Sequence, residues 1–463
     1  MSGCAFARRT KRATSGWRSA CWICCRRMSA RRNATSHGSN VILRRRSPRA
    51  IFAGLPGAGA SSHSTHWTAP REPTPHRGNL LVAYNAARQL LPSANAWYRE
   101  AEGASQDEQQ QVWRVRAALR SLAWDDVARA IDAMPEARAL DPAWRYWKAR
   151  ALSVAGKGED ATRLYGSLAT EHHFYGFLAA EALGAAIMPV SEPLPADASA
   201  LAAFGVRDDV QRVIRLTALE LRPEAQREWL YIVRALDDDT LLLAAEVARR
   251  NGLYDRSINT AERTQRRHDF SLRYPTPYRT EISAAAREYQ IDEAWAFGLA
   301  RQESRFVADI MSSAGAVGLM QLMPATARWV ARQIGQTDYR VGSLEQPELN
   351  AQMGNFYLRH VLDRLDGMPV LATAAYNAGP GRAQAWRGTA PMEGAIYAET
   401  IPFNETRDYV KKVLANAMFY QAQLGLPYIA LRERLGVVAP RGSSGAPSEV
   451  AAIPAGDRPK EAP

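Results

Sequence analysis

One glutamate, Glu303, lies where a helix should be apolar. In the stretch LARQESRF, a rotation of about 100° per residue places Leu299 and Phe306 within about 60° of Glu303. Apolar surroundings disfavour the charged form of a carboxyl group and raise its pKa, so Glu303 can stay protonated near neutral pH and act as a general acid. The structural alternative is a buried ion pair between Glu303 and an arginine.

A glycine-containing corner follows in the stretch SSAGAVGLMQLMPATARWV. Gly315 and Gly318 permit a tight turn, and the proline after Met323 starts a helix. This pattern is typical of a helix–loop–helix corner whose methionines fill the core. The same corner can also form the wall of a groove, where the amide of Gln321 is available to bind a sugar.

A third segment, ATAAYNAGPGR, predicts a helix that ends at Tyr376 and is stopped by Asn377 and the glycines after it. A tyrosine at a helix end usually packs into the core. Its hydroxyl can instead point toward an acid or a substrate, and the two alternatives stay open.

In a fourth segment, IPFNETRDYVKKVL, Asn404 or Thr406 is expected to cap a helix, and Glu405 in the first turn suits the helix dipole. That explains Glu405 without any catalytic role. The apolar stripe of this helix is predicted to be buried and consists of Tyr409, Val410, Val413 and Leu414.

The elements that must position these residues are helices. From about residue 79 the chain shows helical periodicity with short breaks, for example the helix that starts at Asp141-Pro142 and ends at Gly156. Alternation typical of strands is almost absent, so we predict an all-α protein, with a short hairpin in the last domain as the one exception. Stacked helical hairpins without a strict repeat indicate an irregular, solenoid-like α-superhelix in the N-terminal half.

Composition divides the chain into five parts. We predict a disordered Arg-rich arm at 1–78, a helical superhelix at 79–195, a helical linker domain at 196–269, a compact helical domain with the four motifs at 270–431, and a disordered tail at 432–463. The net charge is +12, but residues 1–71 hold 14 Lys and Arg and no acid, so the rest is close to neutral. We therefore do not expect nucleic-acid binding.

All four cysteines lie in the arm: Cys4, Cys21, Cys24 and Cys25. Their spacing differs from the paired spacing of common zinc modules, so no metal site is expected. The chain has no apolar run typical of a membrane helix or of a secretory signal peptide.

The four motifs in this order, ARQESRF, SSAGAVGLMQLMPATA, AAYNAGPGR and IPFNETRDYVKKVL, resemble the catalytic domain of the soluble lytic transglycosylases. These are lysozyme-like enzymes of glycoside hydrolase family 23 that cleave bacterial peptidoglycan. The resemblance covers about residues 270–430. The stretches WRVRAALRSLAWDDV, WRYWKARAL and FYGFLAAEALG resemble, more weakly, the helical ring of the large members, which would be truncated here.

The resemblance implies that Glu303 is the sole catalytic acid/base. It also implies a groove lined by Ser312, Met320, Gln321, Met323, Tyr376, Asn377 and Glu405, with Tyr376 near the catalytic carboxylate. The implied reaction cleaves the β-1,4 bond between N-acetylmuramic acid and N-acetylglucosamine and forms 1,6-anhydromuramoyl products, without metal or cofactor.

Two alternatives stay open: a hydrolytic muramidase on the same fold, and a helical scaffold with a glycan-binding module. The resemblance further implies glycan strands as the partner and a periplasmic location. The helical region is a candidate surface for other cell-wall enzymes.

Overall fold

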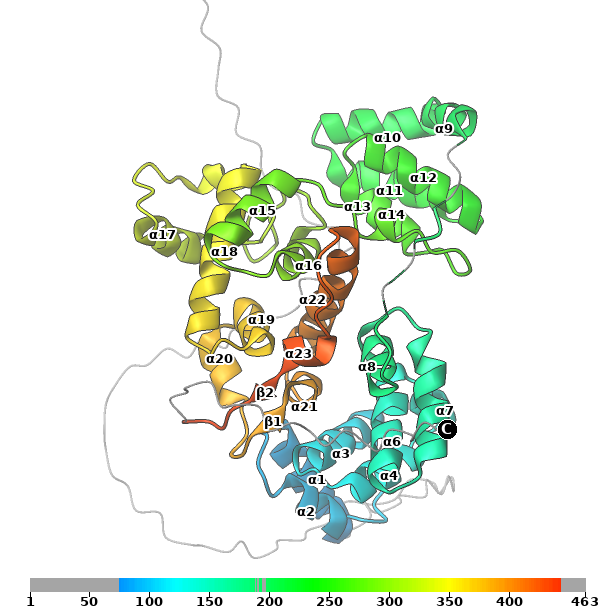
Figure 1. The fold of residues 1–463 in the computed structure, drawn as a ribbon, viewed down its shortest axis with the longest axis vertical. Helices are drawn as coiled ribbons and strands as arrows, with labels where there is room; N and C mark the ends of the chain where they lie inside the picture. Colours follow the sequence, from blue (N-terminus) through cyan, green and yellow to red (C-terminus); the bar gives the residue numbers. More distant parts are fainter. Residues whose placement is uncertain (1–74, 188, 190, 194–196, 443–463) are drawn as a thin grey trace, which may run out of the picture. The chain divides into compact units, whose positions relative to one another are not determined.

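The computed structural model describes residues 75–442, apart from 188, 190 and 194–196. Within these residues the fold is all-α, as predicted (Figure 1). The first group of helices is α1 (Pro75–Arg88), α2 (Ala94–Glu100), α3 (Glu108–Arg120), α4 (Trp124–Asp132), α5 (Glu136–Ala139), α6 (Pro142–Val154), α7 (Gly158–Ala169) and α8 (Phe174–Ala182).

These helices form hairpins, and local signals set their ends. Asp107 and Gln110 make a reciprocal capping box at α3. At α6, Asp141 accepts from the Ala143 amide at 2.9 Å, Pro142 is the first helical residue, and Gly156 follows the helix with φ +76°. The helix predicted between Asp141 and Gly156 is therefore confirmed.

A second group of helices has a separate apolar core. It consists of α9 (Ala198–Gly205), α10 (Asp208–Ala218), α11 (Arg222–Val233), α12 (Asp238–Arg250), α13 (Tyr254–Ala261) and α14 (Phe270–Arg273). Leu201, Val213, Trp229 and Ala244 belong to this core. The division of the chain at 196 and 269 stays a prediction.

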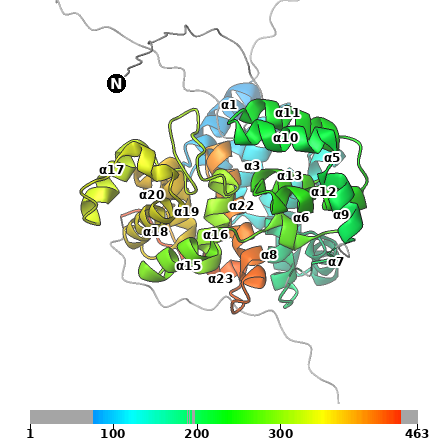
Figure 2. The same cartoon turned by 90° about the horizontal axis from the view of Figure 1, so that it is seen from above.

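The third group contains the four motifs. Its elements are α15 (Arg279–Glu288), α16 (Glu293–Ser304), α17 (Pro324–Gln333), the 3₁₀ helix η1 (Val341–Glu345), α18 (Pro347–Asp363), α19 (Pro369–Ala378), α20 (Pro380–Ala385), β1 (Met392–Glu393), α21 (Gly394–Glu399), α22 (Asn404–Gln423), α23 (Leu431–Leu435) and β2 (Val437–Val438). Helices α16 and α22 pack side by side, as Figure 2 also shows.

The first and third groups share one continuous core. Phe177 of α8, for example, packs edge-on against Phe419 of α22 with ring centroids 5.2 Å apart. The superhelical helices therefore rest directly on the helix that carries the fourth motif.

Two predictions about the end of the chain need correction. The short strands do not form a hairpin: β1 pairs antiparallel with β2, far away in sequence, with Met392 opposite Val438. The tail is ordered beyond residue 432, because Leu435 and Val438 are buried together with Leu431. The apolar residues of α23 and β2 outweigh the composition of the tail as far as residue 442.

At the other end, the predicted arm is too long by a few residues, because α1 already begins at Pro75. Residues 1–74 and 443–463, including all four cysteines, lie outside the described residues.

Candidate active site

Glu303 lies in the last turn of α16. Asp292 caps the start of this helix and accepts from the Trp295 amide at 2.7 Å. The helix ends because Arg305 and Phe306 both adopt left-handed backbone angles, with φ of 50° and 64°. The apolar face predicted around Glu303 is confirmed, since all of its members are buried: Ala296, Leu299, Ala300 and Phe306.

Tyr409 of α22 is the direct partner of this carboxyl group. Its hydroxyl donates a hydrogen bond to Glu303 Oε1 at 2.5 Å. The two helices come close enough because Gly298 of α16 has no side chain: a Cβ there would lie 2.8 Å from the Val413 carbonyl oxygen of α22. The close packing of α16 and α22 therefore places the Tyr409 hydroxyl within hydrogen-bonding distance of Glu303, whose other neighbours on α16 are apolar.

Burial raises the pKa of Glu303 to about 8, although the hydrogen bond from Tyr409 acts in the opposite direction. The negative charge of Glu405 raises this pKa further. The alternative of an ion pair with a nearby arginine does not hold: Arg301 and Arg305 both pair with Glu262 instead, and no ion pair in the described part of the chain includes Glu303. The carboxyl group is thus held protonated near neutral pH.

The glycine-containing corner is organised by a residue that sequence analysis missed. The Asn350 side chain is fully buried, accepts from the Met320 amide at 2.8 Å and donates to the carbonyls of Val317 and Leu344. Gly318 is required here, because its φ is +84° and a Cβ would lie 2.1 Å from Asn350 Nδ2.

Ser312 and Gln321 take part in the turn itself. Ser312 Oγ accepts from the Ala316 amide at 3.0 Å. The side-chain amide of Gln321 donates to the carbonyls of Gly318 at 2.8 Å and Ile310 at 3.1 Å. Both side chains are partly exposed.

The two methionines of the corner have different positions. Met323 is 43% exposed, directly before α17. Met320 is fully buried and packs against Gly354, where a Cβ would collide with its sulfur. The prediction that the Met320 side chain lines a groove is therefore wrong, because the turn directs it into the core.

Tyr376 lies close to this site. Its hydroxyl donates to the Met320 carbonyl at 2.9 Å, so the backbone of Met320 fixes this ring. Burial, together with the nearby charge of Glu303, raises the pKa of Tyr376 well above its usual value. The helix α19 continues to Ala378, two residues beyond the predicted end.

The fourth motif joins α19 through a hydrogen bond: Thr406 Oγ1 donates to Asn377 Oδ1 at 2.7 Å. Thr406 therefore does not cap α22, and neither does Asn404, whose side chain accepts from Arg407 at 2.6 Å. The capping prediction is wrong because Thr406 has a tertiary partner in Asn377 and Asn404 is itself the first residue of the helix, where its side chain accepts from Arg407 one turn later. Glu405 is exposed in the first turn of α22.

Sequence reasoning also missed the role of Tyr409, which it assigned only to a buried stripe. The signal was present: among the residues of this stripe, Tyr409 alone carries a hydroxyl. A buried tyrosine normally needs a hydrogen-bond partner. Its partner is 106 residues away in sequence, which helix periodicity cannot reveal.

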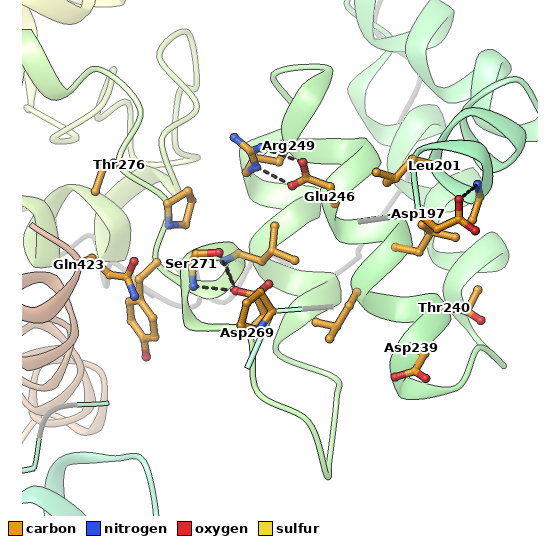
Figure 3. Close-up of a pocket in the computed structure, with 17 residues that line it drawn as sticks. Asp197, Leu201, Asp239, Thr240, Glu246, Arg249, Asp269, Ser271, Thr276 and Gln423 are labelled. Atoms are coloured by element: carbon orange, nitrogen blue, oxygen red, sulfur yellow. Dashed lines mark hydrogen bonds and ion pairs between the residues drawn. The ribbon is translucent and has the colours of Figure 1, made fainter. Parts of the chain in front are cut away.

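A cavity of about 530 Å³ lies elsewhere, among α9, α12, residues 269–276 and Gln423 (Figure 3). None of the predicted site residues lines it. Its carboxylates already have partners within the protein: Glu246 binds Arg249, and Asp269 accepts from Ser271, as the dashed lines in Figure 3 show.

Within residues 75–442 as described, no group of three or more His, Cys, Asp or Glu side chains is placed to hold a metal. No helix in the same part of the chain is long and apolar enough to cross a membrane.

Three regions match known families. Residues 280–397 match the Transglycosylase SLT domain. Residues 205–266 match the soluble lytic murein transglycosylase L domain, and residues 400–428 match the soluble lytic transglycosylase helical domain. The last match falls on α22 and its surroundings, outside residues 79–195, for which sequence analysis predicted a partial ring.

The soluble lytic murein transglycosylase of Salmonella typhimurium is 32% identical over 285 residues, which are 61% of this chain and 44% of that protein. That of Escherichia coli K12 is 30% identical over the same shares. The chain thus spans less than half the length of these relatives.

Solved structures of lytic transglycosylases are also similar to this chain. The lytic transglycosylase Slt of Pseudomonas aeruginosa, solved as an inactive mutant with glutamine in place of a glutamate, has a TM-score of 0.69 and 32% identity, covering 78% of this chain and 59% of that one. The 70 kDa soluble lytic transglycosylase of E. coli has a TM-score of 0.66 and 26% identity, covering 78% and 58%. The same enzyme has also been solved with bulgecin A.

Proposed function

We propose that this chain, a relative of the soluble lytic transglycosylases, cleaves the β-1,4 bond between N-acetylmuramic acid and N-acetylglucosamine in peptidoglycan and leaves 1,6-anhydromuramoyl ends. One observation carries the proposal: Glu303 is a desolvated carboxyl group that accepts a hydrogen bond from the Tyr409 hydroxyl. Among the described ion pairs, none joins Glu303 to a cation, since Arg301 and Arg305 pair with Glu262. The matches to the transglycosylase domain and to the named relatives support the same activity.

In this mechanism Glu303 begins protonated, which its raised pKa favours. It donates the proton to the glycosidic oxygen as the bond from that oxygen to C1 of the muramoyl sugar breaks. The resulting carboxylate then takes the proton of the muramoyl C6 hydroxyl, and the C6 oxygen bonds to C1. Glu303 ends protonated again, and no water is consumed.

A single acid suffices because the substrate supplies the nucleophile, whereas glycosidases that use water normally need two carboxyl groups. Asp309, six residues after Glu303, is engaged in an ion pair with Arg222. Glu405 is the one charged neighbour that affects the Glu303 pKa. We assign Glu405 to substrate binding, since it is exposed and begins α22.

The other predicted residues receive roles that follow from their positions. Tyr409 orients the Glu303 carboxyl group, and Tyr376 is a fixed wall beside it. Ser312, Gln321 and Asn377 present polar atoms for sugar hydroxyl and acetamido groups. The remaining member, Met323, offers an exposed apolar contact, while Met320 contributes through its backbone carbonyl.

Product analysis tests the proposal. The chain is incubated with purified peptidoglycan sacculi, and the released muropeptides are weighed by mass spectrometry. We expect anhydro ends, which are lighter than hydrolysed ends by one water, and no products above background from Glu303→Gln. Hydrated ends would overturn the lyase and support the muramidase.

The second alternative, a glycan-binding scaffold, makes a different prediction for the same variant. Binding of sacculi by Glu303→Gln is expected to persist in both cases. A scaffold would show no turnover in the wild-type chain either, so turnover that is lost in the variant excludes it. The P. aeruginosa relative is inactive as a glutamate-to-glutamine mutant, which supports the enzymatic interpretation.

We further propose a periplasmic location, because that is where peptidoglycan is accessible. The helices α1 to α8 are a candidate surface for cell-wall enzymes. Fractionation of cells that express the chain, with co-purification from the periplasmic fraction, tests both proposals. Recovery of the chain from the cytoplasmic fraction alone would count against the first, and recovery without bound enzymes against the second.

A further inference from the structure

The end of the α16 helix is held from outside its own domain. Glu262, directly after α13, accepts from Arg301 Nη2 at 2.6 Å and from Arg305 Nη1 at 3.0 Å. These two arginines flank Glu303, two residues before it and two after. Figure 1 draws α13 close to α16.

The Arg301 side chain is buried and has further partners besides Glu262. The residue is only 5% exposed, its Nε donates to the Arg273 carbonyl at 2.9 Å, and its guanidinium lies 4.3 Å from the centre of the Tyr274 ring. It also reaches Asn416 of α22, whose amide holds the Gly298 carbonyl at 3.1 Å. One side chain thus links α13, α16 and the helix that carries Tyr409.

Arg305 holds the part of the chain that leaves the helix. Its guanidinium also donates to Asn259 of α13. Four residues later, Asp309 pairs with Arg222 at the start of α11. Two consecutive non-glycine residues in the left-handed region, Arg305 and Phe306, cost free energy and persist only where the surroundings fix them.

Glu262 is ionised in its contact with the two arginines. Burial alone would raise the pKa of Glu262, but Arg301 and Arg305 lower it to about 2. Glu262 is therefore ionised at every pH at which the enzyme would act. Both arginines form their ion pair with Glu262, and among the described ion pairs neither pairs with Glu303.

We infer that Glu262 is a positioning residue for Glu303: through Arg301 and Arg305 it fixes the last turn of α16 so that the Glu303 carboxyl group stays against Tyr409. Glu262 lies within the segment that matches the L domain, so one residue of that segment positions the candidate acid. This inference rests on the proposed function, since it names what sets the geometry of the same acid.

The test uses Glu262→Gln in the full chain, with Glu246→Gln as the matched control. Glu246 is also a carboxylate bound by two arginines in the same group of helices, Arg249 and Arg250, but touches neither α16 nor α22 through them. On soluble glycan strands we expect Glu262→Gln to lower kcat about tenfold and to change KM less than about twofold. The control should leave both constants unchanged.

The pH profile separates positioning from general loosening. The groups that face Glu303 are Tyr409 and Glu405 from α22 and Tyr376 from α19, with Arg301 and Arg305 on its own segment. The variant replaces none of these side chains, although it removes the carboxylate partner of Arg301 and Arg305. A Glu303 carboxyl group that moves toward solvent titrates lower, so the alkaline limb of the profile should move to lower pH in Glu262→Gln only.

A second measurement does not depend on activity. Hydrogen exchange of residues 301–309, followed by mass spectrometry, should be faster in Glu262→Gln than in the wild type or in Glu246→Gln. If the wild type proves inactive, the proposed function fails, and this exchange still decides whether Glu262 holds the segment.

A double-mutant cycle completes the test. If Glu262 acts partly through Arg305, the double variant with Arg305→Gln should lose less than the product of the two single losses. Multiplicative losses, an unmoved pH profile, or a kcat loss equal to the unfolded fraction would each overturn the inference.

Discussion

Two glutamates of this chain, Glu303 and Glu399, differ in burial and have opposite surroundings: Glu303 is half-buried and Glu399 is fully buried. Glu303 lies on an apolar face and accepts one hydroxyl, from Tyr409. Glu399, at the end of α21, is 1% exposed and is bound by Arg116 at 2.9 Å, by Lys411 at 3.0 Å and by the Tyr175 hydroxyl. Helix α22 serves both glutamates, since it carries Tyr409 and Lys411.

Burial disfavours the charge on each, and each accepts a hydrogen bond from a tyrosine hydroxyl. Glu399 is the more buried of the two and is nevertheless ionised, so neither burial nor a tyrosine explains the difference between them. The cations do. Lys411 and Arg116 outweigh burial and hold the pKa of Glu399 far below its usual range, while the pKa of Glu303 rises to about 8. The ion pairs of Glu399 join Arg116 of α3 to Lys411 of α22. The apolar surroundings of Glu303 instead favour its protonated form.

The largest expected effect comes from Glu303→Gln. Removal of a general acid should lower turnover of peptidoglycan about 10²–10⁴-fold. Because the protonated acid and the amide are both neutral, stability to urea should stay nearly the same at pH 5. Activity comparable to that of the wild type would contradict a catalytic role for Glu303, and would leave no functional difference between it and Glu399.

Glu399→Gln should reverse this pattern. It leaves the buried Arg116 and the half-buried Lys411 without their carboxylate, and the loss of one partner of a buried ion pair typically costs about 3–5 kcal/mol of unfolding free energy. Urea denaturation measures the loss, and Glu228→Gln, at an exposed ion pair with Arg212, should cost at most about 1 kcal/mol. A loss no larger than that of the control would show that the cluster contributes no special stability.

Tyr409→Phe sharpens the contrast on the catalytic side. The hydroxyl favours the carboxylate form, so its removal should raise the Glu303 pKa and move the alkaline limb of the pH profile upward. We expect turnover to fall about tenfold at pH 7, because the Glu303 carboxylate that forms during the reaction would lose this hydrogen bond, and a hydrogen bond to a charged group contributes about 1.5–3 kcal/mol. A downward shift of the limb would mean that Tyr409 excludes water rather than donating to Glu303.

The pH dependence of stability should also have opposite signs at the two sites. The folded-state pKa of Glu303 lies above its ordinary value of 4.5, so its stabilising contribution is complete below pH 4.5 and is lost as the pH rises toward 8. For Glu399 the contribution is present above the ordinary pKa and is lost in acid. From pH 5 to pH 8 the wild type should therefore lose stability relative to Glu303→Gln, as urea unfolding at both values would report. An unchanged difference would contradict the raised pKa.

Glu405→Gln should have the smallest effect. Glu405 is exposed, and its charge is the smallest contribution to the elevation of the Glu303 pKa, so its neutralisation should move the alkaline limb down by less than about one unit. Salt screens exposed charges, and the shift should therefore shrink at high ionic strength. A shift that is independent of salt would place Glu405 in direct contact with the acid.

The sequence by itself determined the helices, and it predicted Glu303 as the acid. Helical periodicity placed Glu303 among Leu299 and Phe306, and Asp141-Pro142 fixed a helix start, because these signals act over a few residues. The four motifs in order indicated the transglycosylase family, and the matches agree. The roles of the groove residues remain predictions.

Only the tertiary structure decided the partners of each side chain. The Met320 side chain lies in the core, and Thr406 donates to Asn377 instead of capping its helix. Arg301 pairs with Glu262 and not with Glu303. Each of these contacts joins residues that local periodicity cannot relate. Burial and charge depend on which helices meet: the packing of α16 against α22 raises the pKa of Glu303, whereas the cations around the end of α21 lower the pKa of Glu399.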